Sequence, residues 1–296
     1  MAFIVPNRSR HASGAARAAL ALLLAGIVVA CSPAPGDAAQ VEITVLVAVA
    51  DAVDALVAAD GGDLAPEGAG LGTSSAGGPR MVVRRVDVER LIEVVDVALD
   101  LEASPATATV DAVLQVIGTA QIWQVDAESD GARTLLGEKP MDLRGAVRFE
   151  LERRGRAWLV VGVRRAPLVQ GPDAADLGPW AFTPSRPIAG TPVLITVDVD
   201  APQPADRFIV RAHARFLDGG VALNDAGLGA DAVAYDDTYS GLGRVERRAR
   251  AGAHLVFFSA LNHTATTDLS VDADGAYVRP YSETILPAWA YVRATD

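Results

Sequence analysis

One loop in the C-terminal half holds the carboxylates best placed to bind a metal ion. The loop reads LNDAGLGADAVAYDDTYSG over residues 223–241, and its carboxylates are Asp225, Asp231, Asp236 and Asp237. Carboxylate oxygens are ligands that Ca²⁺ prefers, although this spacing is not that of an EF-hand. Asp and Asn also cap turns by accepting hydrogen bonds from nearby backbone N–H groups. We favour turn capping and keep calcium as the alternative.

The only cysteine, Cys31, closes an N-terminal leader. Arg8, Arg10 and Arg17 come before an apolar run over residues 18–30. That run of about 13 residues is shorter than the roughly 20 that a bilayer span needs, so it predicts a cleaved export signal. A lone cysteine in an exported chain has no internal disulfide partner. The alternative is an ordinary secretory signal with a chance cysteine.

Val28, Val29 and Ala30 before Cys31 resemble the lipobox of bacterial lipoproteins. The resemblance implies that Cys31 becomes the mature N-terminus and carries a diacylglycerol and further acyl chains such as palmitate, and more than one chain gives stable anchoring. Ser32 follows where Asp would direct retention in enteric bacteria, which implies the outer membrane. We therefore expect a signal peptide over residues 1–30 and a polar, proline-bearing tether over residues 31–40.

The charge balance limits the partners of the chain. The sequence has 26 basic and 37 acidic side chains, a net charge of −11, and removing the three leader arginines leaves 23 against 37, or −14. Such a chain repels nucleic acid and anionic lipid surfaces, so binding to either is disfavoured except through a local patch, and no nucleic-acid partner is expected. The partners expected are the membrane, through the lipid anchor, and an unknown protein or small-molecule ligand.

The first half combines helical and strand patterns. Apolar residues recur at helical spacing from Val45 to Val57, and Asp87 is a plausible N-cap for a short helix through Ile92. Long strand patterns follow, with Gly118 at an expected bend. The segment VRFELERRGRAWLVVGV, residues 147–163, predicts a hairpin that turns at Gly155.

This order of elements resembles the NTF2-like (cystatin-like cone) superfamily over residues 41–166. The resemblance implies an α+β domain whose sheet wraps a pocket that can serve enzymes, binders or structural adaptors. Enzymes of that family commonly pair a carboxylate with a His or Tyr, and this region contains neither. Asp96, Asp100 and Asp111 could supply a lone base, but alternating acids on a strand usually form its solvated face. We expect no catalysis.

Arginines gather around the predicted hairpin of this acidic chain. They are Arg144, Arg148, Arg153, Arg154, Arg156, Arg164 and Arg165. The group could bind an anion or a partner, but pairing with Glu150 and Glu152 on a solvated hairpin is favoured.

The second half is predicted to be all β. Residues 167–191 are rich in Pro and Gly and read as a linker with a first strand, held by Trp180 and Phe182. Alternating apolar residues then predict sandwich strands over residues 192–296, including the runs 255–260 and 269–278. Asn224, Asp225, Gly227, Asp231 and Tyr239 belong to a pattern that resembles a bacterial Ig-like module over about residues 176–275. Asp237 replaces the usual Gly, at a turn that favours positive φ.

The sequence therefore predicts an exported, lipid-anchored protein with an NTF2-like domain followed by an Ig-like sandwich. The expected role is a non-catalytic binding or envelope-structural module. One alternative is an enzyme that uses a carboxylate in an enclosed pocket of the first domain. The other is adhesion or display through the second domain, with an exposed patch near Tyr235 and Tyr239. His213, His254 and His263 are not spaced like a zinc site.

Overall fold

The structure is a computed structural model that describes residues 2–5, 42, 44–49, 80–126 and 132–293. Strands make up 62% of it and helices 6%, the latter being two short helices among the described residues. The predicted α+β NTF2-like cone is therefore wrong, whereas the Ig-like β architecture fits in part. The predicted leader cleavage site, Cys31, the tether and the helical pattern beyond residue 49 lie outside the described residues.

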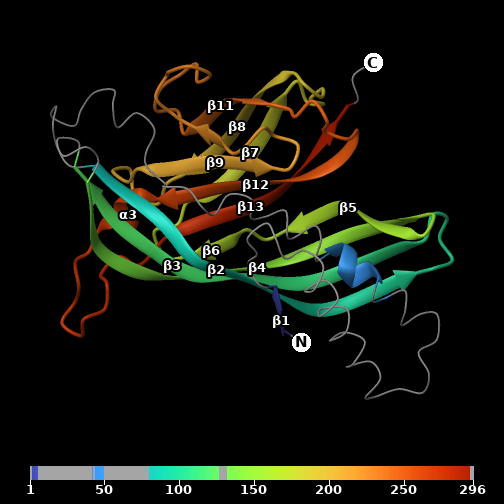
Figure 1. The fold of residues 1–296 in the computed structure, drawn as a ribbon, viewed down its shortest axis with the longest axis horizontal. Coiled ribbons are helices and arrows are strands. Elements are labelled where there is room, and N and C mark those ends of the chain that lie inside the picture. The colour runs from blue at the N-terminus through green and yellow to red at the C-terminus, as the bar shows by residue number, and fades with distance from the viewer. Residues whose placement is uncertain (1, 6–41, 43, 50–79, 127–131, 294–296) are drawn as a thin grey trace.

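Thirteen strands follow one another along the described part of the chain, and the helix α3 lies between the last two of them (Figure 1). They are β1 (Ala2–Val5), β2 (Arg80–Asp100), β3 (Thr107–Val125), β4 (Arg133–Arg154), β5 (Ala157–Arg165), β6 (Leu168–Gln170), β7 (Asp176–Thr183), β8 (Pro192–Asp200), β9 (Phe208–Ala214), β10 (Val221–Leu223), β11 (Thr238–Arg244), β12 (Gly252–Asn262) and β13 (Glu283–Val292), with α3 at His263–Thr267.

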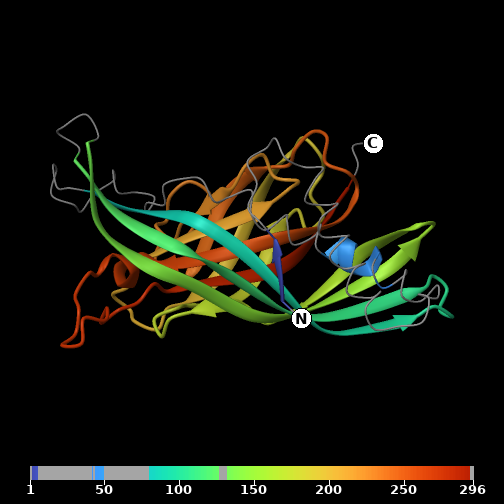
Figure 2. The same ribbon diagram turned by 60° about the horizontal axis from the view of Figure 1, so that its bottom comes forward.

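A large antiparallel sheet runs through the whole molecule. Its strand order is β1-β2-β3-β4-β6-β13-β12-β9-β10, and β5 pairs with β4 beside this path. The three-residue strand β6 pairs with β13 on one side and with β4 through Val169 and Arg144 on the other. The predicted linker over residues 167–191 thus contains β6, which joins the two halves of the sheet, and β7. Figure 2 shows β2, β3 and β4 curving away from the sandwich strands.

A bulge bends the long β2–β3 ribbon. The register jumps from Val86 opposite Thr119 to Glu89 opposite Ile117, so Asp87 and Val88 together face Gly118. Asp87 has φ 52° and lies inside β2, so the predicted short helix from Asp87 to Ile92 is wrong. The placement of Gly118 at a bend is confirmed, because a Cβ there would lie 3.0 Å from the Val86 carbonyl oxygen.

The predicted hairpin over residues 147–163 is confirmed as β4 and β5. Val147, Phe149 and Leu151 are buried on one face, and Gly155 turns the chain with φ 63°. The segment 44–49 is helical as predicted, and Val45 and Val49 join the same buried cluster. Figures 1 and 2 both show this helix, in blue, beside β5.

The second half is a sandwich of two sheets. One sheet has the order β13-β12-β9-β10 and the other β11-β8-β7, which corresponds to strands G-F-C-C′ against E-B-A of an Ig-like fold. Phe182, Phe216 and Phe258 meet between the sheets, and Trp180 stacks on Phe258 with 5.9 Å between ring centroids. The pairing of strand G with β6 is where this molecule departs from a separate Ig-like module.

The strand that completes the sandwich lies later in the chain than predicted. Residues 269–278, predicted as a strand, lie in the connection between α3 and β13 and make only an isolated bridge between Val271 and Tyr277. The strand that completes the sandwich is β13, which is covered on both faces and therefore lacks the alternating pattern of a half-exposed strand.

Candidate functional site

The acidic loop lies between β10 and β11, at the end of the sandwich where Thr238 pairs with Asp198. It brings together carboxylate oxygens of Asp225, Asp231 and Asp236, all within 4.8 Å of one another. Asp237 is not part of this group. Its backbone adopts φ 62° and Tyr235 adopts φ 61°, so non-glycine residues occupy the left-handed conformation in this turn.

The carboxylates of the loop accept hydrogen bonds from its own backbone. Asp231 Oδ2 accepts from Gly227 N at 2.6 Å, and the two oxygens of Asp225 accept from Asp236 N and Asp237 N, each at 3.2 Å. Asp236 Oδ1 accepts from Thr238 N at 3.1 Å. This is the geometry of turn capping. Calcium binding, the alternative, stays an untested prediction. An ion at these oxygens would compete with the backbone N–H groups that donate to them.

Burial raises two pKa values beside this loop. The pKa of Asp225 is raised by desolvation, against its backbone hydrogen bonds, with a further contribution from Asp231. Desolvation, with the carboxylates of Asp225 and Asp237, raises the pKa of Tyr239 to about 12. Tyr239 therefore stays a neutral phenol and packs against the sandwich core. Tyr235, in contrast, is 87% exposed.

The three carboxylates considered for catalysis lie on strands, where two are exposed and Asp111 is half-buried. Asp96 and Asp100 are exposed. Asp111 forms a bidentate ion pair with Arg148 at 2.6 and 2.7 Å, and that hydrogen bonding lowers its pKa. An apolar space between the curved sheet and the sandwich is too small to hold a water molecule, and it is lined by Leu114, Val147, Phe149, Val163, Leu255, Phe257 and Pro287. The desolvated carboxylate that the enzyme alternative requires is not among these lining residues.

Some of the hairpin arginines form ion pairs, and others are exposed at the turn. Arg144, Arg148 and Arg164 form ion pairs with Asp142, Asp111 and Glu150 respectively. Arg154 contacts Glu152 at 3.4 Å, with 65% of its side chain exposed. Arg153 and Arg156 are exposed beside it at the turn. The tip of the hairpin therefore presents arginines to solvent.

The three described histidines lie in different parts of the fold. His213 is inside the large sheet, where desolvation and the nearby Arg85 and Arg211 lower its pKa to about 4. The His254 ring packs on Phe216, and His263 begins α3. None of these three histidines belongs to a group of metal-binding side chains among the described residues.

Sequence reasoning missed a buried lysine. Lys139, the only lysine of the chain, is 0% exposed. Its Nζ donates to the carbonyl oxygens of Ala265, Asp268 and Arg279 at 2.9, 2.5 and 2.6 Å. Desolvation lowers its pKa to about 8, with Asp268 opposing. The alternation along β4 could have revealed this burial. Lys139, Met141 and Leu143 are at every second position of the strand, so their side chains share its buried face.

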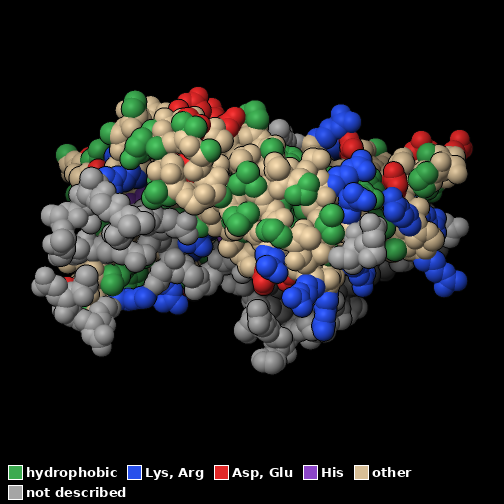
Figure 3. All heavy atoms as spheres, turned by 90° about the horizontal axis from the view of Figure 1, so that it is seen from above, with side chains coloured by type: hydrophobic (Ala, Val, Ile, Leu, Met, Phe, Trp, Pro, Cys, Tyr) green, Lys and Arg blue, Asp and Glu red, His purple; other side chains and the backbone are tan. Residues whose placement is uncertain are grey.

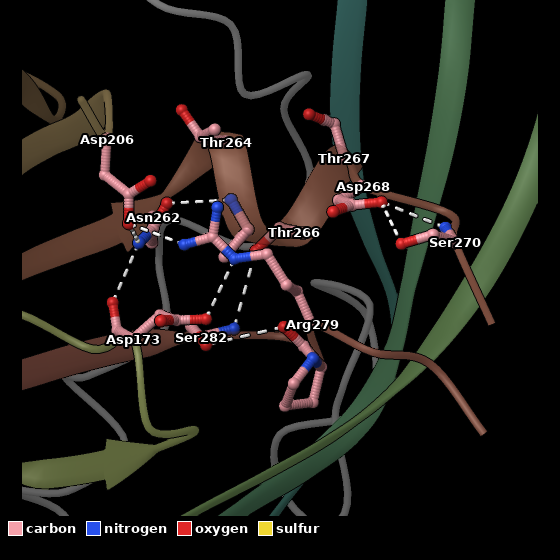
Figure 4. A network of polar contacts seen from close by, with 12 residues as sticks. Asp173, Asp206, Asn262, Thr264, Thr266, Thr267, Asp268, Ser270, Arg279 and Ser282 are labelled. Atoms are coloured by element: carbon pink, nitrogen blue, oxygen red, sulfur yellow. Dashed lines mark hydrogen bonds and ion pairs between the residues drawn. The ribbon is translucent and has the colours of Figure 1, made fainter. Parts of the chain in front are cut away.

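A polar network next to this lysine holds three connections together (Figure 4). Arg279 donates to Asp173 at 3.0 Å and to Asp206 at 2.7 Å, and Asn262 donates to Asp206 at 2.6 Å. Asn262 also caps α3 by accepting from Ala265 N. The connections before β7, between β8 and β9, and after α3 are thereby fixed to one another.

A second buried group links the two halves of the sheet. Arg85 on β2 donates from Nη2 to Glu283 and from Nε to the Tyr281 hydroxyl at 3.1 Å, and that hydroxyl donates to Glu283. Burial raises the pKa of Tyr281 well above its ordinary value. The contacts of this group join β2 to the start of β13, which is a structural role.

The fold and these sites define a class of protein: an antiparallel β protein in which a long curved sheet continues into a sandwich of Ig-like strand order. Comparisons with protein-family models, with curated proteins and with solved structures found no match to this chain. Among the described residues, no helix is both long enough and apolar enough to cross a membrane.

Proposed function

We propose that the chain is a lipid-anchored protein of the bacterial envelope that presents a binding surface and does not catalyse a reaction. The observation that carries the proposal is the loop between β10 and β11. Its side chains Leu228, Val233 and Tyr235 are 49%, 56% and 87% exposed. The same loop is held in shape by the hydrogen bonds to Asp225 and Asp231. Apolar groups exposed on an ordered loop are typical of a protein-binding surface.

The position of this loop supports display away from the membrane. The helix over residues 44–49 lies beside β5, whereas the loop lies at the far end of the sandwich (Figure 1). Eleven residue steps separate Cys31 from Glu42 (42 − 31), and they span at most about 40 Å when fully extended. An anchor on Cys31 would therefore keep the helix end of the molecule near the bilayer.

Anchoring is tested by metabolic labelling with an alkynyl palmitate in a bacterial host that processes lipoproteins. Wild-type protein is expected to take up the label and to stay with the membrane fraction. Cys31→Ser should abolish the label and release the chain, whereas Ser32→Ala should retain both. An unlabelled wild-type chain would reject the lipid anchor.

The binding surface is tested with a photo-crosslinking side chain at position 235 in intact envelopes. A discrete adduct is expected, and Val233→Ser with Leu228→Ser should remove it. The matched control places the same group at position 291, since Tyr291 is 50% exposed at the other end of the sandwich. The same adducts from positions 235 and 291 would contradict a dedicated surface. If adducts form only at position 291, the binding surface is elsewhere.

A further inference from the structure

The end of the molecule beside the helix over residues 44–49 concentrates exposed arginines. At the tip of the β4–β5 hairpin these are Arg153, Arg154 and Arg156, and the turn between them, Gly155, has open space around it. Trp158 is buried immediately behind the tip. The hairpin is therefore anchored in the core while its turn extends arginines into solvent.

A second loop brings more arginines to the same end. The β11–β12 connection carries exposed Arg244, Arg247, Arg248 and Arg250. Its ends are placed by pairing, since Arg244 lies opposite Pro192 and Gly252 lies opposite Val292. Figure 1 shows that these strand ends and the β4–β5 hairpin lie toward the same side, to the right.

The local charge is opposite in sign to that of the chain. Among the described residues, the acids that stand against these seven arginines are Glu152, Glu246, Asp218, whose backbone N donates to the Arg244 carbonyl, and, on the neighbouring β2–β3 turn, Asp100 and Glu102, which leaves two positive charges in excess. The chain as a whole has a net charge of −11. At the other end of the sandwich, residues 224–237 contain four aspartates and no basic residue. In Figure 3, most of the basic side chains on this face lie toward the right, with acidic side chains among them at the far upper right, and a group of acidic side chains stands at the upper left.

We propose that this arginine-rich end, residues 153–156 and 244–250, lies against the anionic phospholipid headgroups of the membrane that holds the lipid anchor. The inference rests on the proposed lipid anchor at Cys31. A molecule with a positive end and a negative end orients its positive end toward an anionic surface. Each arginine held near such a surface favours association by about fivefold, so the three hairpin arginines together contribute on the order of 100-fold. The acidic loop with Tyr235 then points away from the bilayer.

The test uses the lipidated protein, extracted from membranes and reconstituted into phosphatidylcholine vesicles with or without phosphatidylglycerol. Because the native cysteine is acylated, Ala157→Cys introduces the only free thiol, beside the hairpin tip, for a fluorophore. A spin-labelled headgroup serves as the quencher. Quenching is expected to be strong with phosphatidylglycerol and weak without it, and to fall at about 0.5 M salt, where the Debye length is only a few ångströms.

Two controls make the result specific. The variant R153Q/R154Q/R156Q should lose the quenching that depends on phosphatidylglycerol, whereas R84Q/R133Q/R207Q, which removes three arginines from the opposite end, should keep it. A fluorophore at position 226, through Ala226→Cys, should remain unquenched. Equal quenching in the two kinds of vesicle, or equal quenching at positions 157 and 226, would overturn the proposed orientation.

Flotation separates this inference from the anchor on which it rests. Anchored protein floats with pure phosphatidylcholine vesicles whatever its arginines do. A chain that fails to float there lacks the anchor, and the proposed function fails on that point. The basic end is then tested alone by flotation with phosphatidylglycerol vesicles at low salt, where binding that the triple hairpin variant loses upholds the inference and no binding overturns it.

Discussion

Lys139→Met offers the sharpest test of how the α3 region is held in place. The amine donates to three buried backbone carbonyl oxygens, and a methionine would leave them without these donors. An unpaired buried acceptor costs about 1 kcal/mol or more, so the methionine variant is expected to lose about 3 kcal/mol of unfolding free energy.

Urea unfolding followed by circular dichroism measures this loss as a lower midpoint with an unchanged slope. Glu138→Gln is the matched control, since Glu138 is exposed one residue away on the opposite face of β4, and it should change stability by less than about 0.5 kcal/mol. Amine acylation gives an independent readout, because Lys139 is the only lysine. Slow acylation in native protein and rapid acylation in urea are expected. A loss below about 1 kcal/mol in Lys139→Met, or rapid native acylation, would refute the reasoning.

The pH dependence of this lysine has a defined sign. Its folded pKa of about 8 lies below the unfolded value of 10.5, so between these values the unfolded chain binds the extra proton and the stability contribution of Lys139 rises with pH. From pH 8 to pH 9.5 the stability gap between wild type and Lys139→Met should widen by about 2 kcal/mol. A constant gap would mean that the amine is not desolvated.

Three further perturbations test other parts of the structure. The pKa of His213 is lowered to about 4, so wild type should lose about 2 kcal/mol between pH 6.5 and pH 4.5 that His213→Gln does not lose, and equal losses in urea titrations would exclude a neutral buried imidazole. Gly118→Val should cost about 1–3 kcal/mol in urea unfolding, because its Cβ would meet the Val86 carbonyl oxygen at 3.0 Å, and a neutral result would show that the bulge relaxes freely. Asp231→Ala should remove the hydrogen bond from Gly227 N, which lowers the unfolding free energy by about 1 kcal/mol and therefore lowers the melting temperature. Millimolar Ca²⁺ should leave the melting temperature of wild type unchanged. A calcium-dependent rise that Asp231→Ala abolishes would instead make the acidic loop a metal site.

Elements with a strong local pattern could be predicted from the sequence. The β4–β5 hairpin follows from alternation on both sides of Gly155, and β12 coincides with the apolar segment Gly252–Asn262. The helix at residues 44–49 follows from its spacing of valines. Each of these elements has one buried and one exposed face, so the spacing of its apolar residues indicates whether it is a helix or a strand.

The errors arose where distant contacts override the local pattern. Asp87 looked like a helix cap, but pairing with β3 makes it the extra residue of a bulge opposite Gly118. The NTF2-like interpretation failed because order of elements alone does not fix which strands pair. It did not anticipate β6, a three-residue strand that continues the sheet into the sandwich.

The sequence by itself determined the acidic net charge and the acidic turn with its capping residues, and it predicted an export leader ending at Cys31. Only the tertiary structure decided that Lys139 and Glu283 are buried, that Tyr235 is exposed, and that two loops distant in sequence place their arginines at one end. The physical reason is that charge and turn propensity are properties of neighbouring residues, whereas burial and shared location depend on strand pairings between residues far apart in the chain.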